Sequence, residues 1–319
     1  MKIMQYVQSR DAKMSRYILG MDVGGTNVRL GLVDEEYCLR DFQIVPSGSL
    51  QNNQLSTVEN LILTIQSYLK KFGQGRAVAA ISAGFPATLD RDRKKILSTP
   101  NIWGFNNVEI VDLIEKATGI KTYIETDVDM LLLHDVYKNH LSHKGIVCGF
   151  YFGTGFGNAI MIDGKLLAGK NGAAAELGHI PMRGVYGNCG CGNHSCVEMI
   201  ASGYHLNEIR KKNFPETEIG EMFTKHSDAS QIKQMIDDLA LATACEINIL
   251  DPDETIFGGG LVNMKDFPKK MFESALKKYT RKPYPAENLI CTYAEQSQEN
   301  GVIGAGLLGF QKLNEEGIM

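Results

Sequence analysis

The sequence predicts an α/β protein built from two related halves, and three observations lead to this fold class. A strand, a glycine turn and a second strand are expected near the N-terminus, over residues 17–34. The same order of elements returns at residues 145–169, far along the chain. Segments with helical periodicity lie between the two units and after them. A unit that occurs twice favours a duplicated architecture over a single sheet.

The first unit begins with an apolar run at residues 17–23, which is typical of a buried strand. Asp22 lies near the end of this run, and a Gly-Gly-Thr turn follows at residues 24–26. Residues 28–34 then alternate, with Val28, Leu30 and Leu32 on one face, as expected for a second strand with one buried face. We therefore expect the glycine turn to connect two paired strands.

Several segments have apolar residues at helical spacing. The first has the strongest start signal, because Ser56 and Glu59 stand at the spacing of a capping box. A last helix is expected from Asn300, where small residues allow close packing. The remaining helices are expected at residues 108–119, 128–139, 236–250 and 266–279.

The second unit repeats the pattern of the first. An apolar strand from residue 145 reaches a second glycine turn at residues 153–155. A further strand ends at the dipeptide Asp163-Gly164, which is a common hairpin turn. Later, a short strand at residues 255–262 runs into three consecutive glycines, which form a third glycine turn.

Composition bounds the possible functions. The 319 residues are 44% hydrophobic and 22% charged, which is ordinary for a globular protein of about two domains. A net charge of -4 argues against a broad basic surface for nucleic acid. No apolar run approaches the roughly 18 residues of a membrane helix, and the N-terminus lacks the apolar core of a signal peptide. We expect a cytoplasmic protein with reduced thiols.

Three of the seven cysteines cluster in one glycine-rich stretch. Cys189, Cys191 and Cys196 follow His179, and together they form a Cys₃His set that is typical of a closed structural zinc site. A disulfide is disfavoured, because one residue separates the first two cysteines and the compartment is expected to be reducing. A chance cluster or another metal is the alternative. A zinc knuckle for nucleic acid would bring more basic and aromatic residues.

The three glycine turns together favour a nucleotide site. Backbone N–H groups at such turns can face phosphate oxygens, although any single turn would be interpreted as hairpin geometry. The acid Asp22 before the first turn can hold Mg²⁺ through water, and the three glycines from Gly258 allow a flat ring or ribose to approach the backbone. The chain has no P-loop motif and no dinucleotide-binding motif.

This set of turns resembles the sugar kinase, hexokinase and actin superfold, and the cysteine stretch is a more specific marker. The strings AELGHIPM and GNCGCGNHSCVE are similar to the signature of the ROK (repressor, ORF, kinase) family. The resemblance covers the chain from about residue 17 to its end. The strings ILSTPNI, AAELGHIP and KKYTRKPYPAENLI are most similar to bacterial D-allose kinases.

The resemblance implies an α/β fold of two actin-like, hexokinase-like (ribonuclease H-like) halves around a central cleft. The first domain would span residues 16–125, with the C-terminal helix 300–315 packing back on it. The larger second domain would span residues 126–299 and carry the cysteine loop. ATP and a sugar would meet between the halves, where closure excludes water. The family also implies a homodimer.

The resemblance further implies the roles of individual residues. Asp127 is the expected catalytic base that accepts the proton of a sugar hydroxyl, although a helix cap is the simpler interpretation of this acid alone. His179 is expected to bind zinc through one nitrogen and a sugar hydroxyl through the other. The expected sugar contacts are Asn101, Thr126, Asp127, Glu176, His179 and Glu198. The expected nucleotide contacts are Asp22, Gly24, Gly25, Thr26, Thr154, Gly155, Gly258, Gly259 and Gly260. Without the resemblance, Glu176 and Glu198 would be interpreted as solvated side chains.

The implied activity is transfer of a phosphoryl group from ATP, with Mg²⁺, to O6 of a hexose. D-allose is the preferred substrate, because Thr126 replaces the Asn that usually precedes the base and touches sugar hydroxyls in glucose kinases. N-acetylmannosamine and glucose are the alternatives on the same scaffold. A non-catalytic, sugar-sensing regulator of the family is disfavoured by the short stretch before the first strand and by the intact Asp127.

Overall fold

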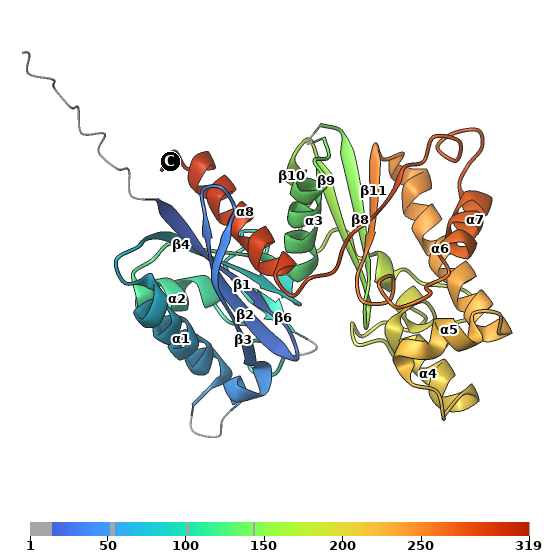
Figure 1. Cartoon of the computed structure of the whole chain (residues 1–319), viewed down its shortest axis with the longest axis horizontal. Helices are drawn as coiled ribbons and strands as arrows, with labels where there is room; N and C mark the ends of the chain where they lie inside the picture. Colours follow the sequence, from blue (N-terminus) through green and yellow to red (C-terminus); the bar gives the residue numbers. More distant parts are fainter. Residues whose placement is uncertain (1–14, 52–54, 100–101, 143, 319) are drawn as a thin grey trace, which may run out of the picture.

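The computed structural model describes residues 15–51, 55–99, 102–142 and 144–318. Two five-stranded mixed sheets stand side by side, and helices lie on both faces of each sheet (Figure 1). We call the parts built on these sheets the first half and the second half. A small antiparallel ribbon of β5 (Thr88–Leu89) and β6 (Ile96–Ser98) belongs to the first half.

The first sheet has the strand order β3-β2-β1-β4-β7. Strand β2 is antiparallel to both of its neighbours, whereas β4 is parallel to both of its neighbours. The strands are β1 (Arg16–Val23), β2 (Asn27–Asp34), β3 (Leu39–Pro46), β4 (Ala77–Phe85) and β7 (Thr122–Thr126). The predicted strand–turn–strand unit is the β1–β2 hairpin, which closes around the first glycine turn.

The second sheet repeats this topology with the order β10-β9-β8-β11-β12. Strand β9 is antiparallel to its neighbours, and β11 is parallel to its neighbours. The strands are β8 (Ile146–Phe152), β9 (Phe156–Ile162), β10 (Lys165–Leu166), β11 (Glu254–Gly258) and β12 (Cys291–Tyr293). The duplicated architecture predicted from the two strand–turn–strand units is confirmed.

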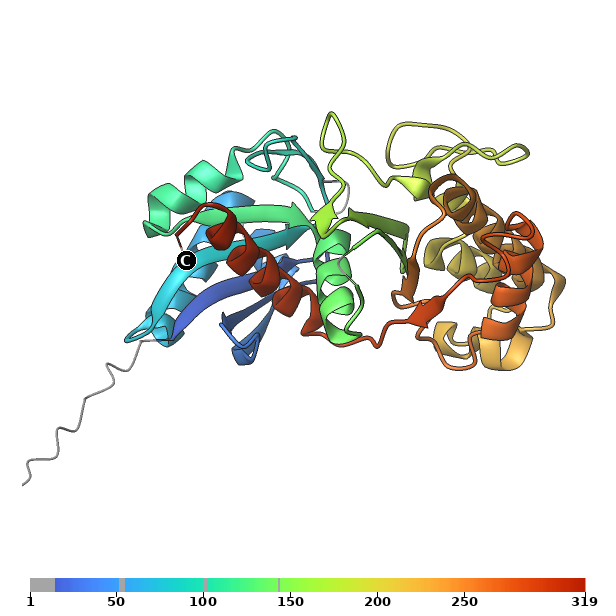
Figure 2. The ribbon, with the colours of Figure 1, turned by 90° about the horizontal axis from the view of Figure 1, so that it is seen from above.

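The helices form three layers around the two sheets (Figures 1 and 2). The outer face of the first sheet packs against α1 (Thr57–Tyr68) and α2 (Ile110–Thr118). The outer face of the second sheet packs against α4 (Gly203–Asn213), α5 (Met222–His226), α6 (Ser230–Leu250) and α7 (Lys269–Tyr279). Between the sheets lie α3 (Asp127–Lys138) and α8 (Asn300–Glu315).

One apolar cluster joins the two halves through the central helices. It contains Ile18 of the first sheet, Met130 of α3, Met161 of the second sheet and Leu308 of α8, all buried. Gly304 allows α8 to approach α3 closely, because a Cβ at this position would clash with the backbone carbonyl of Met130. Burial of this apolar surface therefore fixes the position of α3 relative to both sheets.

The predicted element boundaries are confirmed in part. Helix α1 starts at the predicted capping box, in which Ser56 and Glu59 bond to each other's backbone N–H groups. The predicted hairpin turn at Asp163-Gly164 has the expected positive φ angles of 48° and 78°. Helix α6 starts six residues earlier than predicted, and α7 starts later, because Asp266 has a left-handed φ of 58° that no α-helix accommodates.

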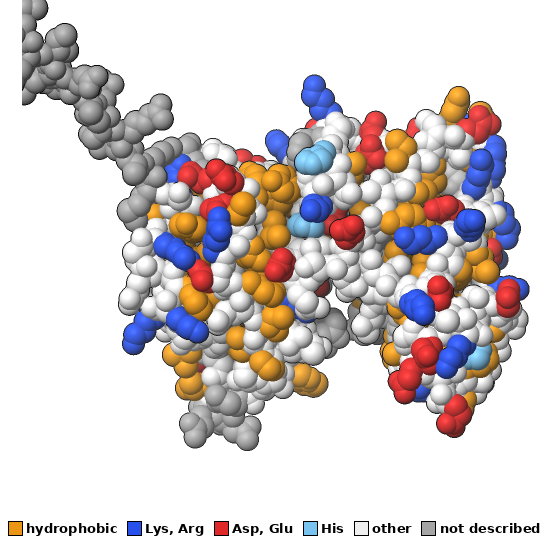
Figure 3. Space-filling model, in the orientation of Figure 1, with side chains coloured by type: hydrophobic (Ala, Val, Ile, Leu, Met, Phe, Trp, Pro, Cys, Tyr) orange, Lys and Arg blue, Asp and Glu red, His pale blue; other side chains and the backbone are white. Residues whose placement is uncertain are grey.

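The surface drawn in Figure 3 has acidic and basic side chains interspersed over both halves, and its outline is notched between them. Across the described ranges of the chain, no helix combines the length and the apolar character needed to cross a lipid bilayer.

Candidate active site

The acid Asp127 lies at the junction of β7 and α3, between the two halves. Strand β7 ends at Thr126, which is the N-cap of α3, and the Thr126 side chain accepts the backbone N–H of Asp129. Thr126 is therefore the helix cap, a role that the sequence alone also allowed for Asp127. Asp127 occupies the first turn of the helix, where the backbone N–H groups favour a negative charge.

Acids from both halves lie close enough to Asp127 to act on its charge. Burial, followed by the negative charge of Asp22 and then that of Glu176, raises the pKa of Asp127 to about 6, although a hydrogen bond from the backbone N–H of Val128 opposes this. Asp22 belongs to β1 of the first half, and Glu176 belongs to the second half. The structure therefore gathers three predicted site acids around the start of α3.

The first glycine turn is held by side chains of its own hairpin. Asp22 and Arg29 are cross-strand partners in the β1–β2 register, and Arg29 Nη1 donates to Asp22 Oδ2 over 2.8 Å. Arg29 Nε donates to Oε1 of Gln298, over 2.7 Å, in the segment that connects β12 to α8. Burial raises the pKa of Asp22, and the guanidinium of Arg29 opposes this shift.

No role for Arg29 is predicted from the sequence. The predicted strands 17–23 and 28–34 leave four residues between them, and pairing outwards from that gap places Arg29 opposite Asp22. A cavity of about 170 Å³ is lined by Asp22, Arg29, Gln298 and Gly259, and it brings the first and third glycine turns to one space.

The second glycine turn is held by other parts of the second half. The carboxylate of Glu198 accepts the backbone N–H of Phe156 over 2.8 Å, and it lies where a Cβ of Gly155 would be. The N-terminus of α4 closes the other side, because the N–H groups of Gly203 and Tyr204 donate to the carbonyls of Gly153 and Thr154. This turn is therefore placed by the segment that follows the cysteines.

The third glycine turn follows β11, at Gly258, Gly259 and Gly260. Gly259 has a φ of 90°, and a Cβ at this position would collide with the backbone of Phe152 at the end of β8. Glycine is thus required both by the left-handed backbone and by the close packing of two strand ends. The turn borders the same cavity as Asp22.

The four predicted metal ligands converge. One ligand atom from each of His179, Cys189, Cys191 and Cys196 lies within 4.8 Å of all the others. The Nδ1 of His179 is 3.5 Å from Sγ of Cys189, and Sγ of Cys191 is 3.6 Å from Sγ of Cys196. A tetrahedral zinc site with Zn–S bonds of about 2.3 Å has ligand–ligand distances of roughly 3.8 Å. The donor set and its spacing therefore fit zinc.

The pKa values of the three thiols in this cluster are shifted in different directions. Burial raises the pKa of Cys189, and it raises the pKa of Cys196 to about 12. For Cys191, burial is outweighed by hydrogen bonds, first from the backbone N–H of Asn193 and then from the other thiols, so its pKa is lowered. A bound dication would stabilise all three groups as thiolates.

The cysteine loop, residues 179–196, places two acids beside each other. Its ends are paired by a β-bridge between Pro181 and Cys196, so Glu176 before the loop and Glu198 after it are neighbours. Burial raises the pKa of Glu176, with the charge of His179 opposing and that of Glu198 reinforcing the shift. His179 Nε2 is 3.7 Å from Glu176 Oε2, so the ring turns one nitrogen to the cysteines and the other to Glu176.

Thr126 and Asn101 differ from the other predicted sugar contacts. The hydroxyl of Thr126 donates to Asp129 Oδ2 over 2.7 Å and accepts the N–H of Asp129, so both of these bonds occupy it within α3. Asn101 lies outside the described residues. The predicted acids, His179 and the three glycine turns are thus the part of the site whose arrangement the structure describes.

Comparison with known proteins identifies the family. The ROK family model matches residues 18–312. A glucokinase of Thermotoga maritima is 25% identical over 264 residues, covering 76% of this chain and 82% of the relative. An N-acetyl-D-glucosamine kinase of Vibrio atlanticus is 26% identical over 313 residues, covering 92% and 99%.

A solved structure shows the same fold. The ROK family glucokinase from Streptomyces griseus, crystallised with glucose and AMPPNP, superposes with a TM-score of 0.75 at 24% identity, covering 92% of this chain and 99% of that one. The fold is therefore the actin-like, hexokinase-like α/β fold that the cysteine signature and glycine turns implied. With the family model spanning both halves, this chain belongs to the ROK family.

Proposed function

We propose that this protein is an ATP-dependent sugar kinase that phosphorylates a hexose at O6. One observation carries the proposal. The acid of the first glycine turn, Asp22, and an acid beside the cysteine loop, Glu176, are both near enough to Asp127 for their charges to raise its pKa. A phosphate cradle and a sugar pocket built from these two sides would meet at Asp127.

In this proposal Asp127 accepts the proton of the sugar hydroxyl as the hydroxyl oxygen attacks the γ-phosphorus of ATP. Such a transfer depends mainly on positioning and on charge screening. A single base that is ionised at neutral pH is sufficient on the protein side. The pKa of about 6 leaves Asp127 largely ionised at pH 7, yet basic enough to accept a proton.

The three glycine turns would hold the nucleotide. The named residues are Asp22, Gly24, Gly25, Thr26, Thr154, Gly155, Gly258, Gly259 and Gly260. Asp22 fits a role in holding Mg²⁺ through water, because Arg29 engages only Oδ2 and no group among the described residues bonds to Oδ1. Magnesium would screen the charge of the phosphates.

Zinc in the Cys₃His cluster would be structural, because four protein ligands leave no open position. Its proposed role is to hold Glu176, His179 and Glu198 toward one sugar. With Nδ1 of His179 on zinc, Nε2 carries the proton and can donate to a sugar hydroxyl or to Glu176. Asn101 and Thr126 complete the proposed sugar contacts.

D-allose is the proposed substrate. Because the Thr126 hydroxyl is engaged by Asp129, position 126 has no free donor for the hydroxyl that Asn contacts in glucose kinases. A sugar that differs in the orientation of that hydroxyl then loses nothing at this position. N-acetylmannosamine and glucose remain the alternative substrates, and N-acetylglucosamine joins them because a relative is named for it.

The two halves are proposed to close as domains over residues 16–125 and 126–299, with α8 on the first, and the protein is proposed to be a homodimer. The experiment is an ADP-release screen with ATP and Mg²⁺ over allose, glucose, mannose, fructose, N-acetylmannosamine and N-acetylglucosamine. The proposal predicts turnover with at least one hexose and the highest kcat/KM with allose. Sugar binding without turnover of any sugar would favour the sugar-sensing regulator.

A further inference from the structure

Arg93 occupies a turn whose backbone is firmly held. The turn connects β5 to β6, and the carboxylate of Asp90 accepts the N–H groups of Lys94 and Lys95 over 2.8 and 2.9 Å. The N–H of Arg93 itself donates to the carbonyl of Asp90. Arg93 has a left-handed φ of 54°, and its Nη1 also lies 3.2 Å from the carbonyl oxygen of Asp90 in the same turn. The position of this guanidinium is therefore set by the turn rather than by a flexible loop.

The guanidinium of Arg93 forms a buried ion pair with Glu125. Nε is 2.6 Å from Glu125 Oε1, and the two side chains are only 15% and 8% exposed. No other side chain in the described part of the chain pairs with Glu125 as a cation. Loss of Arg93 would leave a buried carboxylate without a counter-charge, which is costly in a low-dielectric site.

On its other side, Arg93 reaches the second half of the molecule. Nη1 donates to the backbone carbonyl of Gly172 over 2.9 Å. Gly172 has a φ of 77°, and a Cβ there would collide with Arg93 Nη1 and with the backbone at Leu89. It lies in the segment after β10, which comes against the β5–β6 ribbon (Figure 2) and continues to Glu176.

Glu125 connects Arg93 to the start of α3. It immediately precedes Thr126, and its Oε1 accepts the Thr126 backbone N–H over 3.1 Å. Burial and then the charge of Glu125 raise the pKa of Asp129 well above its usual range, and Asp129 Oδ2 accepts the Thr126 hydroxyl over 2.7 Å. A chain of contacts therefore runs from Arg93 through Glu125 to Thr126, the residue before Asp127, and on to Asp129 in the first turn of α3.

We propose that Arg93 is a positioning residue for the sugar site, holding the Thr126–Asp127 junction at the end of β7 against the Gly172–Glu176 segment of the second half. This inference rests on the proposed function, because it gives the pair a part in placing base and sugar. Arg93 touches neither reactant and acts only through Glu125 and Gly172.

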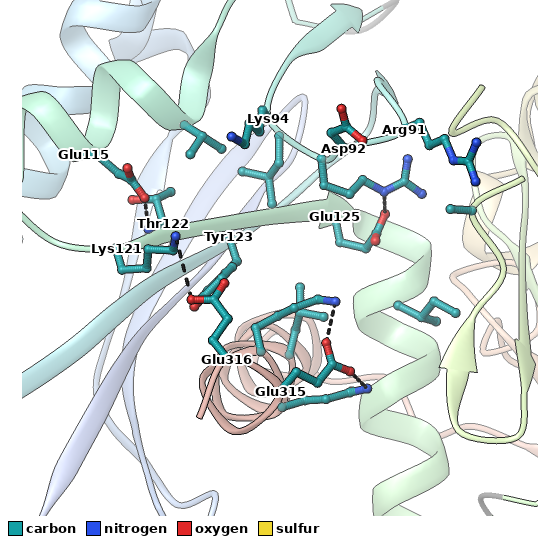
Figure 4. A pocket seen from close by; sticks show the side chains of 18 of the residues that line it. Arg91, Asp92, Lys94, Glu115, Lys121, Thr122, Tyr123, Glu125, Glu315 and Glu316 are labelled. Atoms are coloured by element: carbon teal, nitrogen blue, oxygen red, sulfur yellow. Dashed lines mark hydrogen bonds and ion pairs between the residues drawn. The ribbon is translucent and has the colours of Figure 1, made fainter. Parts of the chain in front are cut away.

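The surroundings of the pair make the proposal testable by substitution. Arg93 and Glu125 form part of the wall of a cavity of about 630 Å³ (Figure 4). Glu125 extends from the end of β7 toward this space, and the labelled Arg91 is nearby without an ion pair to it. A shorter side chain at position 93 leaves room that water can fill, so a variant need not unfold. Arg91→Met is the matched control, because it removes an exposed guanidinium two residues away.

Three variants separate the two contacts. Arg93→Lys keeps a charge for Glu125 and cannot hold Gly172 at the same time, so we expect kcat within about twofold and a KM for sugar raised about tenfold. Glu125→Gln keeps the Gly172 bond, so we expect the reverse split, with kcat lowered about tenfold and KM little changed. Arg93→Met loses both contacts and should show both effects. A merely structural role would lower stability without this division between kcat and KM.

Backbone hydrogen exchange on the full chain tests the link without reference to turnover. In Arg93→Met, and not in Arg91→Met, residues 165–176 and 122–130 should exchange at least about tenfold faster while the outer helix α7 stays unchanged. Unchanged exchange in both segments, or equal kinetic effects in the two methionine variants, would overturn the inference. If the wild-type chain turns over no sugar, the proposed function fails, and the exchange experiment still decides whether Arg93 joins the halves.

Discussion

The two strand–turn–strand units have the same topology but are anchored differently. In the first, Asp22 and Arg29 of the same hairpin pair across the turn, and Ser47 at the end of β3 donates to the carbonyl of Gly24. In the second, the turn at Gly155 depends on Glu198, which lies beyond the cysteine loop. The first turn is therefore a local structure, whereas the second is only as well placed as the cysteine loop.

The same topology is therefore stabilised by local contacts in the first half and by distant contacts in the second half. The first hairpin also bonds to Gln298 through Arg29, but Asp22, Arg29 and Ser47, all of the first half, hold its turn. The position of the turn at Gly155 depends on the conformation of the cysteine loop. The proposed sugar contacts Glu176, His179 and Glu198 lie in or beside the same loop. The comparison therefore predicts that damage to the cysteine loop spreads to the second turn and leaves the first intact.

The largest effect is expected at the residue on which both units converge. Asp127→Asn removes the proposed base and keeps the shape of the side chain, so turnover should fall by about 10²–10⁴-fold. Calorimetry should find binding of sugar and of an ATP analogue within about threefold of wild type. The matched control is Asp163→Asn, in the hairpin turn of the second sheet. Turnover within tenfold of wild type would remove Asp127 as the base.

Loss of the metal is the next largest expected effect. Elemental analysis should find about one zinc per chain, and Cys191→Ser should lower both the zinc content and the melting temperature. Cys38→Ser is the control, because this exposed cysteine lies in the first half. Hydrogen exchange should then rise at residues 153–157 and stay unchanged at residues 22–29. Full zinc content in Cys191→Ser would show that the ligand set is wrong. An equal rise in hydrogen exchange at both turns would contradict the claim that only the second turn depends on the cysteine loop.

The two acids beside the cysteine loop sharpen the comparison further. Glu198 bonds to the second turn, whereas Glu176 lies near Asp127 and His179. Glu198→Gln should therefore weaken both nucleotide and sugar binding, by about tenfold each, and Glu176→Gln should weaken sugar binding alone. Titrations of both ligands into both variants test this. Identical losses in the two variants would contradict the assigned difference.

The smallest expected effect is a pH dependence. The folded-state pKa of Asp127 is raised to about 6, first by burial and then by Asp22 and Glu176. A base must be ionised, so kcat/KM should be constant near pH 7–8 and fall about tenfold per unit as pH drops below about 6. The same shift makes ionised Asp127 a cost to folding, so its contribution to unfolding free energy should improve as pH falls from about 6 toward 4. A pH–rate profile flat down to pH 4.5 would refute the assignment.

Much of the fold could be predicted because its signals are local. The capping box at Ser56 and Glu59, the Asp163-Gly164 turn and the two glycine hairpins each depend on residues close in sequence. Strands β3, β4, β5, β6 and β12 were not predicted. For β4 and β12 no adjacent turn marks the strand, because both pair in parallel with strands distant in the chain. Helix α6 was predicted too short, because its first turns place polar residues between Ile232 and Met235.

The site, in contrast to the fold, was not predicted from local structural signals. Its residues were found from a family signature, and geometry entered only through the Cys₃His spacing. What the sequence could not reveal are contacts across long separations: Arg29 with Gln298, and Arg93 with Glu125 and Gly172. No periodicity or spacing marks these pairs, because each depends on how elements distant in the sequence pack together.

The most direct test is a crystal structure of the ternary complex with allose and a non-hydrolysable ATP analogue with Mg²⁺. The account predicts that O6 of the sugar lies about 2.6–3.2 Å from a carboxylate oxygen of Asp127, with Glu176 and Glu198 on other hydroxyls and the triphosphate against the glycine turns. A sugar bound away from Asp127, or one that Glu176 and Glu198 do not touch, would contradict it.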